Sequence, residues 1–401
     1  MAVTVEADSL AAADPLTGIR EALARVRQPT ANARGMPNAT YVDPRYFDIE
    51  RRLIMAPGWA CVGFVSDVDQ PGYAKPISLM GLPLVILCDR QGEIGVFHNV
   101  CSHRGMRLVR EAGPVGRSLR CPYHSWTYGL DGRLRGTAHI GGVGQHRLAG
   151  FPCERFGLRR VRSAVWMGLI FVNLSGDAPS LETHLDGLTR RWSQFVGDGL
   201  SMLRADRGGG ALRLEAHCNW KLAMENYCEA YHLPTVHPAL NRYSRLQDHY
   251  DIVGEDNFVG QGCRAYNAAE VAGTRLPRFP EWPSDRPHHA EYVALFPNVC
   301  LGLQADHAFA VVLEPVAHDR TLEHLRLFYV GDEALGHHYS AHREATLASW
   351  RRVFEEDLDA VEGLQLGRQS PAFEGGIFSP VMDTPTHQFH RWVACQLSQP
   401  V

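Results

Sequence analysis

The chain has 401 residues, of which 45% are hydrophobic and 21% charged, and its formal net charge at pH 7 is −4. That balance is typical of a globular protein of two or three domains, and it gives no electrostatic reason to expect nucleic acid or an anionic membrane surface as a partner. The longest apolar run, residues 164–172, is too short to span a membrane, and ten scattered cysteines without an apparent export signal lead us to expect reduced thiols in the cytoplasm.

The first 160 residues divide into a polar amino-terminal segment and a β-rich domain. We expect residues 1–55 to contain one helix, over 18–26, which Pro29 ends, and to pack on the second domain. In residues 56–160, short apolar runs such as 83–88 are interrupted by Gly, Pro and Asp at intervals of about 8–12 residues. This spacing predicts a small antiparallel β domain.

Residues 161–401 predict a second domain that mixes helices with sheet, so the fold class expected for the whole chain is α+β. A segment rich in Pro, Arg and His, at about 273–290, is expected to be an irregular loop. No internal repeat is evident. The expected helices cover residues 181–196, 220–233 and 338–368, and the clearest expected strands cover residues 308–313 and 325–330.

A first set of metal ligands is expected in two short loops of the β domain. One loop offers Cys101 and His103, and the other offers Cys121 and His124. Two thiolates and two imidazoles form the ligand set of a Rieske [2Fe–2S] cluster, with the cysteines on one iron and the histidines on the other. A Cys₂His₂ zinc site uses the same atoms, but it usually pairs like residues, whereas each loop here is mixed.

A second set is expected around residue 230. Glu225, Glu229 and His232 are spaced by four and three residues, so a continuous helix would carry them on one face. Pro234 disfavours further helix, which would leave His232 at a helix end and His237 just beyond the break. This geometry lets both imidazoles converge on one metal.

Two histidines and one carboxylate form the facial triad of non-heme Fe(II) oxygenases, which leaves positions open for O₂. The best candidate for the carboxylate is Asp357, in the run EEDLDAVEGLQLG. A mononuclear zinc hydrolase is the competing metal interpretation. A Rieske site in the same chain favours iron.

With both segments known, residues 55–401 resemble the ring-hydroxylating oxygenase α-subunit family of Rieske non-heme iron oxygenases. The runs CSHRG and CPYHSWTYGLDG are similar to the cluster motifs of that family. The run NWKLAMENYCEAYHLPTVHP is similar to its mononuclear iron motif, and EED, followed by Glu362 and Gln365, to its carboxyl-terminal motif.

The resemblance implies an antiparallel β Rieske domain joined to a helix-grip-like catalytic domain, residues 161–401, with a central antiparallel sheet and helices. It also implies a homotrimer, in which the cluster of one subunit lies next to the mononuclear iron of its neighbour. Glu229 would then carry electrons and protons across that interface. Asn219 is expected either to border the iron pocket or to cap a helix.

Most ring dihydroxylases have Asp where this chain has Glu229, and the Glu resembles the branch that acts on quaternary ammonium compounds. We therefore expect oxidative N-demethylation of a substrate of the proline betaine or glycine betaine type, with release of formaldehyde. The alternative is hydroxylation or dihydroxylation of an aromatic acid by the same iron chemistry. Aromatic faces would suit a methylated cation. Candidates are Tyr266, Trp282, Tyr292 and Phe309, although core packing is the favoured role for each.

Electrons are expected to come from a partner protein. No G-x-G-x-x-G run follows a predicted strand, so NAD(P)H and flavin are assigned to a separate ferredoxin or flavoprotein reductase. Two interpretations from other classes remain: a Rieske electron-transfer protein, which would leave about 300 residues unexplained, and a zinc-binding structural protein.

Overall fold

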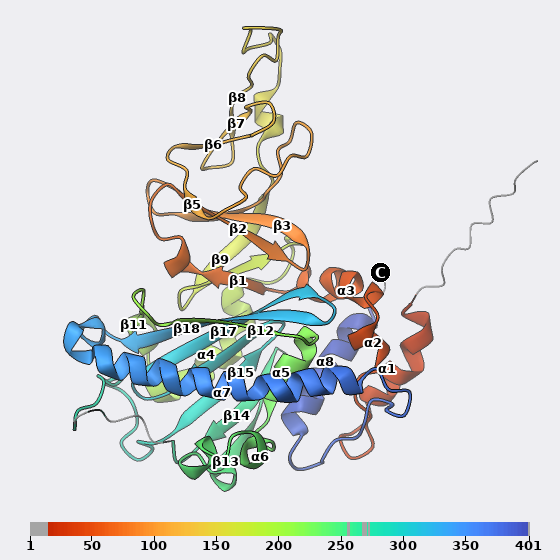
Figure 1. Ribbon diagram of the computed structural model, residues 1–401, viewed down its shortest axis with the longest axis vertical. Helices are drawn as coiled ribbons and strands as arrows, with labels where there is room; N and C mark the ends of the chain where they lie inside the picture. Colours follow the sequence, from red (N-terminus) through yellow and green to blue (C-terminus); the bar gives the residue numbers. More distant parts are fainter. Residues whose placement is uncertain (1–14, 255–256, 267–270, 272, 400–401) are drawn as a thin grey trace, which may run out of the picture.

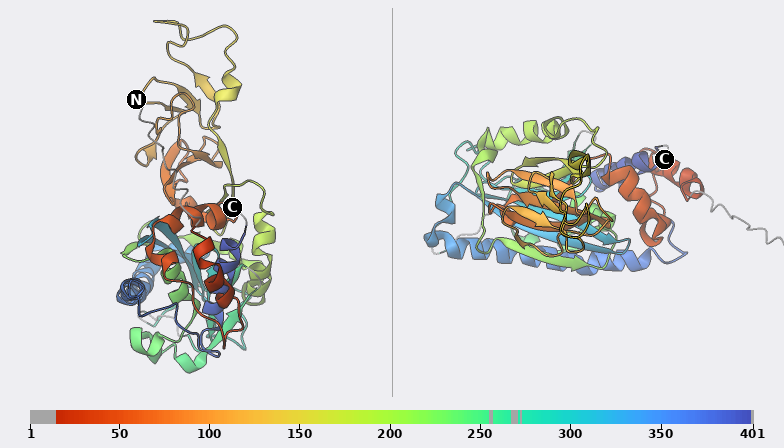
Figure 2. Two further views of the ribbon diagram at one scale, coloured as in Figure 1. Left: turned by 90° about the vertical axis from the view of Figure 1, so that its right-hand side faces the viewer. Right: turned by 90° about the horizontal axis from the view of Figure 1, so that it is seen from above.

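The structure, a computed structural model, describes residues 15–254, 257–266, 271 and 273–399. A β-rich part stands on a larger part in which helices cover both faces of a sheet (Figures 1 and 2). The described residues form two large sheets and one small one, and all of their strand pairs are antiparallel. The predicted α+β class is confirmed.

The first sheet has seven strands in the order β1-β10-β9-β4-β3-β2-β5. Two of its hairpins close through the dipeptides Met80-Gly81 and Met167-Gly168, in which every residue has a positive φ. Two-residue turns of this kind match the twist of the paired strands. The strands are β1 (Ala60–Phe64), β2 (Tyr73–Leu79), β3 (Leu82–Cys88), β4 (Ile94–His98), β5 (Gly113–Pro114), β9 (Arg160–Trp166) and β10 (Leu169–Asn173).

A three-stranded sheet, β6-β7-β8, lies at the far end of the β-rich part (Figure 1). Its core includes Leu119, Trp126 and Tyr128. The strands are β6 (Ser118–Arg120), β7 (Thr127–Gly129) and β8 (Leu134–Gly136). Although β9 and β10 lie at or beyond the expected domain boundary at residue 160, they pair into the first sheet, and the domain limits stay a prediction.

The second large sheet has eight strands, in the order β11-β18-β17-β16-β15-β14-β13, with β12 also paired to β18. Strands β14, β15 and β16 are buried along their whole length, because helices cover both faces of the sheet. The strands are β11 (Leu203–Ala205), β12 (Ala211–Ala216), β13 (His249–Val253), β14 (Phe258–Cys263), β15 (Ala290–Leu295), β16 (Val299–Leu303), β17 (His307–Ala317) and β18 (Arg320–Val330).

One face of this sheet is covered by α4 (Leu181–Val196), the helix predicted at these residues. The hydroxyl of Ser180 accepts a hydrogen bond from the backbone N–H of Thr183, which caps the helix start. The apolar face of α4 buries Leu185, Leu188 and Trp192 against the sheet. In Figure 1 α4 lies behind the sheet and α7 in front of it.

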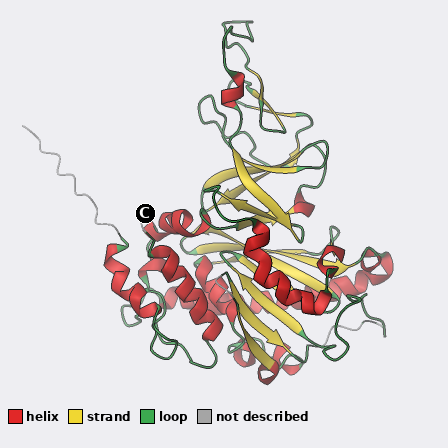
Figure 3. Ribbon diagram, turned by 180° about the vertical axis from the view of Figure 1, so that it is seen from behind, coloured by secondary structure: helices red, strands yellow, loops and turns green. Residues whose placement is uncertain are grey.

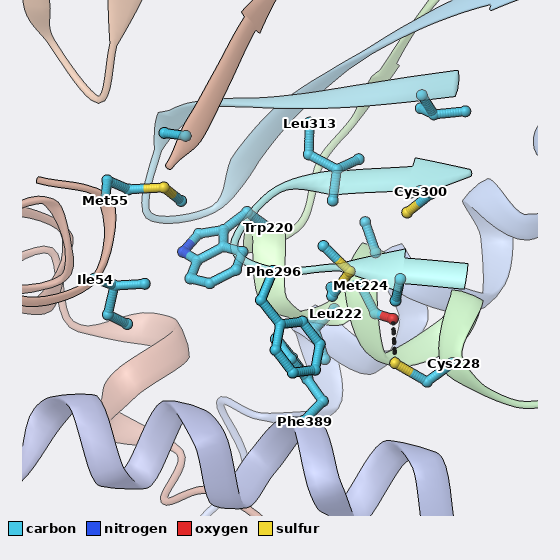
Figure 4. Packing of buried hydrophobic residues seen from close by; sticks show 14 of the residues in the cluster. Ile54, Met55, Trp220, Leu222, Met224, Cys228, Phe296, Cys300, Leu313 and Phe389 are labelled. Carbon is cyan, nitrogen blue, oxygen red and sulfur yellow. Dashed lines mark hydrogen bonds between the residues drawn. The ribbon is translucent and has the colours of Figure 1, made fainter. Parts of the chain in front are cut away.

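The opposite face carries α5 (Trp220–Cys228), α7 (Ser340–Gly367) and α8 (Thr384–Leu397). Trp220, Phe296 and Phe389 pack together here, where α5 and α8 meet the sheet (Figure 4). The other α-helices are α1 (Arg20–Val26), α2 (Ala39–Val42), α3 (Arg45–Glu50) and α6 (Leu233–Val236), and Arg51–Met55 forms a π-helical turn.

Short 3-10 turns join many of these elements. Seen from behind, the helices gather around the second sheet, whereas the β-rich part is mainly strand and loop (Figure 3). No described helix has both the length and the apolar character needed to cross a membrane. The 3-10 turns are Thr17–Ile19, Val65–Asp67, Cys153–Phe156, Gly199–Met202, Leu240–Arg242, Leu246–Asp248, Glu333–Leu335 and His337–Tyr339.

Candidate metal centres

Two loops with matching backbone hydrogen bonds present the first group of predicted ligands. The carbonyl of Cys101 accepts a hydrogen bond from Gly105 N at 3.0 Å, and the carbonyl of Cys121 accepts one from Ser125 N at the same distance. Gly105 and Ser125 have φ angles of 76° and 57°, so both chains turn sharply at the same place. The loops thus form a pair of equivalent knuckles that face each other.

The structure brings all four predicted cluster residues together. Cys101 and Cys121 are buried and lie next to each other, and the ring centroids of His103 and His124 are 4.7 Å apart. Nδ1 of His124 is buried and has no hydrogen-bond partner among the described residues. A buried ring nitrogen without a partner is costly unless it binds something, so these residues fit a metal cluster.

Two aromatic residues behind these loops support them. The hydroxyl of Tyr128 lies 3.1 Å from Sγ of Cys101, and it accepts a hydrogen bond from the backbone N–H of Ser102 at 3.1 Å. The indole of Trp126 stacks on the ring of His103, with centroids 4.7 Å apart. Trp126 thus packs behind the loops, whereas Tyr128 also reaches the sulfur, and a hydrogen bond to the sulfur tunes the potential of a cluster.

The segment that carries the second group is not one continuous helix, which corrects the prediction for residues 220–233. Helix α5 ends at Cys228, and Glu229 is extended, with φ −133° and ψ 166°. The Glu229 carboxylate accepts hydrogen bonds from the backbone N–H groups of Tyr231 and His232, which replace helical bonds. Glu225 therefore does not share a helix face with Glu229 and His232.

Pro234 lies at the start of a helix, whereas the sequence analysis expected it to disfavour further helix. It lies in the first turn of α6, where proline lacks only an N–H that a helix start leaves unpaired anyway. His232 is the N-cap residue of α6 and His237 its C-cap residue. One turn of helix therefore separates the two imidazoles.

The second group consists of His232, His237 and Asp357, whose candidate ligand atoms all lie within 4.8 Å of one another. Nε2 of His237 lies 2.9 Å, and Nε2 of His232 3.7 Å, from Oδ1 of Asp357. A long stretch of chain separates Asp357, on α7, from the two histidines. This donor set fits a facial site with two histidines and one carboxylate.

A second carboxylate holds each of these imidazoles from behind. Nδ1 of His232 lies 2.6 Å from Glu229, and Nδ1 of His237 lies 2.9 Å from Glu356. Burial lowers the pKa of His237, but the hydrogen bonds to Asp357 and Glu356 outweigh it, so the pKa is raised. The sequence analysis missed Glu356, although the run EED placed it beside Asp357.

Asn219 lies outside the metal group. Its side chain caps α5 by accepting a hydrogen bond from the backbone N–H of Lys221 at 3.1 Å, and it donates one to the carbonyl of His318 at 2.7 Å. It does not line the cavity beside the metal group. Of the two roles suggested by the sequence, the structure places it in the capping one.

A cavity adjoins His232, His237 and Asp357. Of the aromatic candidates, only Tyr292 lines it: Tyr266 and Phe309 pack near Trp350, and Trp282 belongs to the core under α4. Trp350 and Phe354 lie seven and three residues before Asp357, and this helical spacing could have predicted that they line the same cavity as Asp357. The lining residues are Asn226, Tyr227, His232, Leu233, His237, Leu240, Ser244, His249, Gln261, Tyr292, Trp350, Val353, Phe354 and Asp357.

Family models match both parts of the chain. The Rieske [2Fe-2S] domain model matches residues 58–147, and the model of the ring hydroxylating alpha subunit (catalytic domain) matches residues 203–399. The chain belongs to the Rieske-type oxygenases. This oxygenase therefore carries a [2Fe–2S] domain and a mononuclear iron domain, and the predicted cofactors are confirmed at that level.

Similar proteins carry related names. The glycine betaine monooxygenase oxygenase subunit of Chromohalobacter salexigens is 27% identical, over 94% of this chain and 89% of the relative. The carnitine monooxygenase oxygenase subunit of Acinetobacter baumannii is also 27% identical, over 84% of this chain and 86% of that one. A solved quaternary ammonium Rieske monooxygenase has a TM-score of 0.76 at 23% identity, covering 93% of this chain and 98% of that one, which confirms the fold.

The match to a catalytic domain excludes two interpretations that the sequence left open, an electron-transfer protein and a zinc-binding structural protein. A carrier of electrons alone would not need a catalytic domain, and neither would a structural zinc protein. The oxygenase is therefore an enzyme. The assignment of individual ligands, Cys101, His103, Cys121 and His124 to the cluster and His232, His237 and Asp357 to the iron, stays a prediction.

Proposed function

We propose that this oxygenase removes a methyl group oxidatively from a quaternary ammonium compound. The observation that carries the proposal is the aromatic cavity beside His232, His237 and Asp357. The names of the relatives, which include glycine betaine and carnitine monooxygenase oxygenase subunits, support the same substrate class.

Four aromatic side chains from three elements surround this cavity. Tyr292 and Trp350 meet edge to face with centroids 5.8 Å apart, and Tyr227 lies parallel to Phe354 at 6.4 Å. The faces of such rings attract a cation that cannot form hydrogen bonds, as a quaternary ammonium cannot. An N-methyl group held there would lie beside the proposed iron ligand Asp357.

The proposed ligands have distinct tasks. When bound, the cluster of Cys101, His103, Cys121 and His124 supplies single electrons, and the iron at the second group activates O₂. Glu229 bonds to Nδ1 of His232, and Glu356 bonds to Nδ1 of His237. These bonds orient both imidazoles so that each Nε2 faces Asp357.

In the proposed reaction, one atom of O₂ is inserted into a C–H bond of the N-methyl group. The other atom leaves as water after uptake of two electrons and two protons. The hydroxymethyl group then loses its O–H proton, and the C–N bond breaks with its electron pair going to nitrogen. The products are a tertiary amine and formaldehyde.

We also propose a homotrimer fed by a separate reductase. Within one chain, the whole first sheet stands between the knuckles near β6 and β7 and the metal group near α6 (Figure 1). His103 is exposed, and Glu229 lies beside the exposed Tyr231. A neighbour's His103 meeting Glu229 would shorten the electron path. Sedimentation should show a trimer, and full activity in a stable monomer would contradict this.

The test combines purified oxygenase, a ferredoxin-type reductase and NADH with a panel of choline, glycine betaine, carnitine and proline betaine, plus benzoate as an aromatic acid. We expect formaldehyde from at least one methylated compound, in step with NADH use, and none from Asp357→Ala. Failure of the whole methylated panel, with conversion of benzoate instead, would favour ring hydroxylation.

A further inference from the structure

The cavity beside the metal group has no fixed positive charge. No lysine or arginine is among the described residues that line it, and the residues outside the described ranges contain neither type. Among the described residues that line the cavity, Asp357 is the one acidic residue. A small zwitterion such as glycine betaine would therefore find no basic side chain to pair with its carboxylate.

His249, the lining histidine outside the proposed metal ligands, does not supply that charge. Burial lowers its pKa, which favours the neutral ring. Its Nδ1 donates to Oε1 of Gln261, because an amide oxygen can only accept. Nε2 is then an acceptor and lies 3.0 Å from the hydroxyl of Ser244. Both ring nitrogens are occupied.

Ser244 and Gln261, two other polar residues of the cavity wall, also bond to protein groups. The hydroxyl of Ser244 is shared between His249 and Sγ of Cys263, at 3.1 Å from the sulfur. The amide of Gln261 donates to the backbone carbonyl of Glu229 at 3.3 Å. The amide of Asn226 remains as a neutral donor in the described wall, so few such groups are available to an anion.

The aromatic residues follow the same pattern. The hydroxyl of Tyr227 donates to the carbonyl of Leu301, and the indole N–H of Trp350 donates to Nε2 of His307, each at 2.9 Å. The polar donors of these two residues are thus bonded to protein groups and are not available to a ligand. Such a wall binds a methylated cation, but it leaves a buried carboxylate without partners.

The charges around the metal group also disfavour an anion in the cavity. Asp357, with Glu229 and Glu356 behind the histidines, makes three carboxylates. Divalent iron at this position would offset two of these three charges, so the surroundings stay negative overall. A second anion placed in this space would be repelled, whereas a cation would be stabilised.

We propose that the preferred substrate is a quaternary ammonium compound with a net positive charge, and that a carboxylate on it weakens binding. This rests on the proposed function and narrows its substrate class. It departs from the betaine type that the resemblance implies, because betaines are zwitterions. Choline-like compounds, esters and amides belong to the favoured class.

The test compares glycine betaine with glycine betaine amide, which has nearly the same shape but no negative charge. Calorimetric titration of the iron-loaded enzyme should show that the amide binds at least about tenfold more tightly, and formaldehyde release should follow the same order. Equal or tighter binding of glycine betaine, with formaldehyde released from both, overturns this inference and leaves the proposed function standing. If neither compound binds or releases formaldehyde, this inference is overturned, and the proposed function is overturned with it when the rest of the methylated panel also fails.

A charge added to the cavity wall gives a second measurement. Leu240 lines the cavity and is half-buried, so an arginine there can present a cation without disturbing the metal group. Leu240→Arg should improve the binding of glycine betaine relative to the amide by about tenfold, whereas the uncharged control Leu240→Gln should not. An unchanged preference in Leu240→Arg would overturn the electrostatic explanation.

Discussion

Oε2 of Glu356 lies 2.9 Å from Nδ1 of His237, so a residue of α7 orients an imidazole at the end of α6. Nε2 of the same ring lies 2.9 Å from Asp357, the next residue of α7. Two adjacent carboxylates thus hold opposite sides of one histidine, which makes its orientation depend on the rotation of α7.

Loss of the Glu356 carboxylate should weaken the mononuclear site without emptying the cluster. Removal of such a partner typically costs about 10- to 100-fold in metal affinity, and we expect Glu356→Ala to fall in that range and Glu356→Gln to recover part of it. Iron titration of the apoprotein measures this. The control is Glu355→Gln, because Glu355 is exposed and contacts only Arg351 among its described ion pairs. Equal affinity in all variants would contradict the role.

Asp357→Ala should remove the mononuclear iron alone. The iron content is then expected to fall from about three to about two per chain, while the visible absorption of the cluster stays. Elemental analysis and absorption spectra check this. Asp359→Ala, a matched change at an exposed position of the same helix, should keep all of the iron. Retention of three irons in Asp357→Ala would show that the third ligand lies elsewhere.

Tyr128→Phe should lower the reduction potential of the cluster. The hydroxyl is 3.1 Å from Sγ of Cys101, where a donated hydrogen bond stabilises the more negative, reduced cluster. The expected shift is on the order of 60 mV, the equivalent of one hydrogen bond of ~1.4 kcal/mol. Potentiometric titration measures it. Tyr123→Phe, at an exposed tyrosine within the loop of Cys121 and His124, removes a hydroxyl that contacts neither cysteine and should leave the potential unchanged.

Glu225 should stabilise the fold in a pH-dependent way. Burial raises the pKa of Glu225, but His390, Arg368 and Tyr41 outweigh it and lower the pKa from 4.5 to about 2. A lowered pKa in the folded state gives stability that is present above about pH 4.5 and lost as the pH falls toward 2. Glu225→Gln should therefore cost on the order of 3 kcal/mol near neutral pH.

Denaturant unfolding at several pH values measures this difference. The free-energy gap between the wild type and Glu225→Gln should stay constant from pH 7 to about pH 5 and then shrink as the pH falls further. Glu215→Gln, which changes a partly exposed carboxylate of β12, serves as the control. A gap that widens on acidification would have the wrong sign and would contradict the assignment.

Structural features that depend on the spacing of a few neighbouring residues could be predicted from the sequence. Helix α4 begins and ends where its apolar spacing predicted, and the last long helix was expected over residues 338–368, where α7 is found. The mixed Cys and His pairs predicted two knuckles, and these carry equivalent backbone hydrogen bonds. In each case the spacing of residues along the chain contains the needed information.

Near residue 230, side-chain hydrogen bonds to the backbone interrupt the helix that the sequence predicted. Helical spacing put Glu225, Glu229 and His232 on one face, but the Glu229 carboxylate bonds to the N–H groups of Tyr231 and His232 and the helix ends. Glu225 instead pairs with Arg368 and His390. Such local competition for backbone donors is hard to read from periodicity.

The α+β class and the two predicted ligand sets could be read from residue types and short-range spacing alone. Tertiary structure decided which distant groups meet: Glu356 behind His237, Tyr128 on Cys101, and Trp350 and Phe354 beside Tyr227 and Tyr292. The rotation of α7 against the sheet selects the contacts of Glu356, Trp350 and Phe354, and that rotation results from packing over the core of the second sheet. The Tyr128 contact results from packing within the β-rich part.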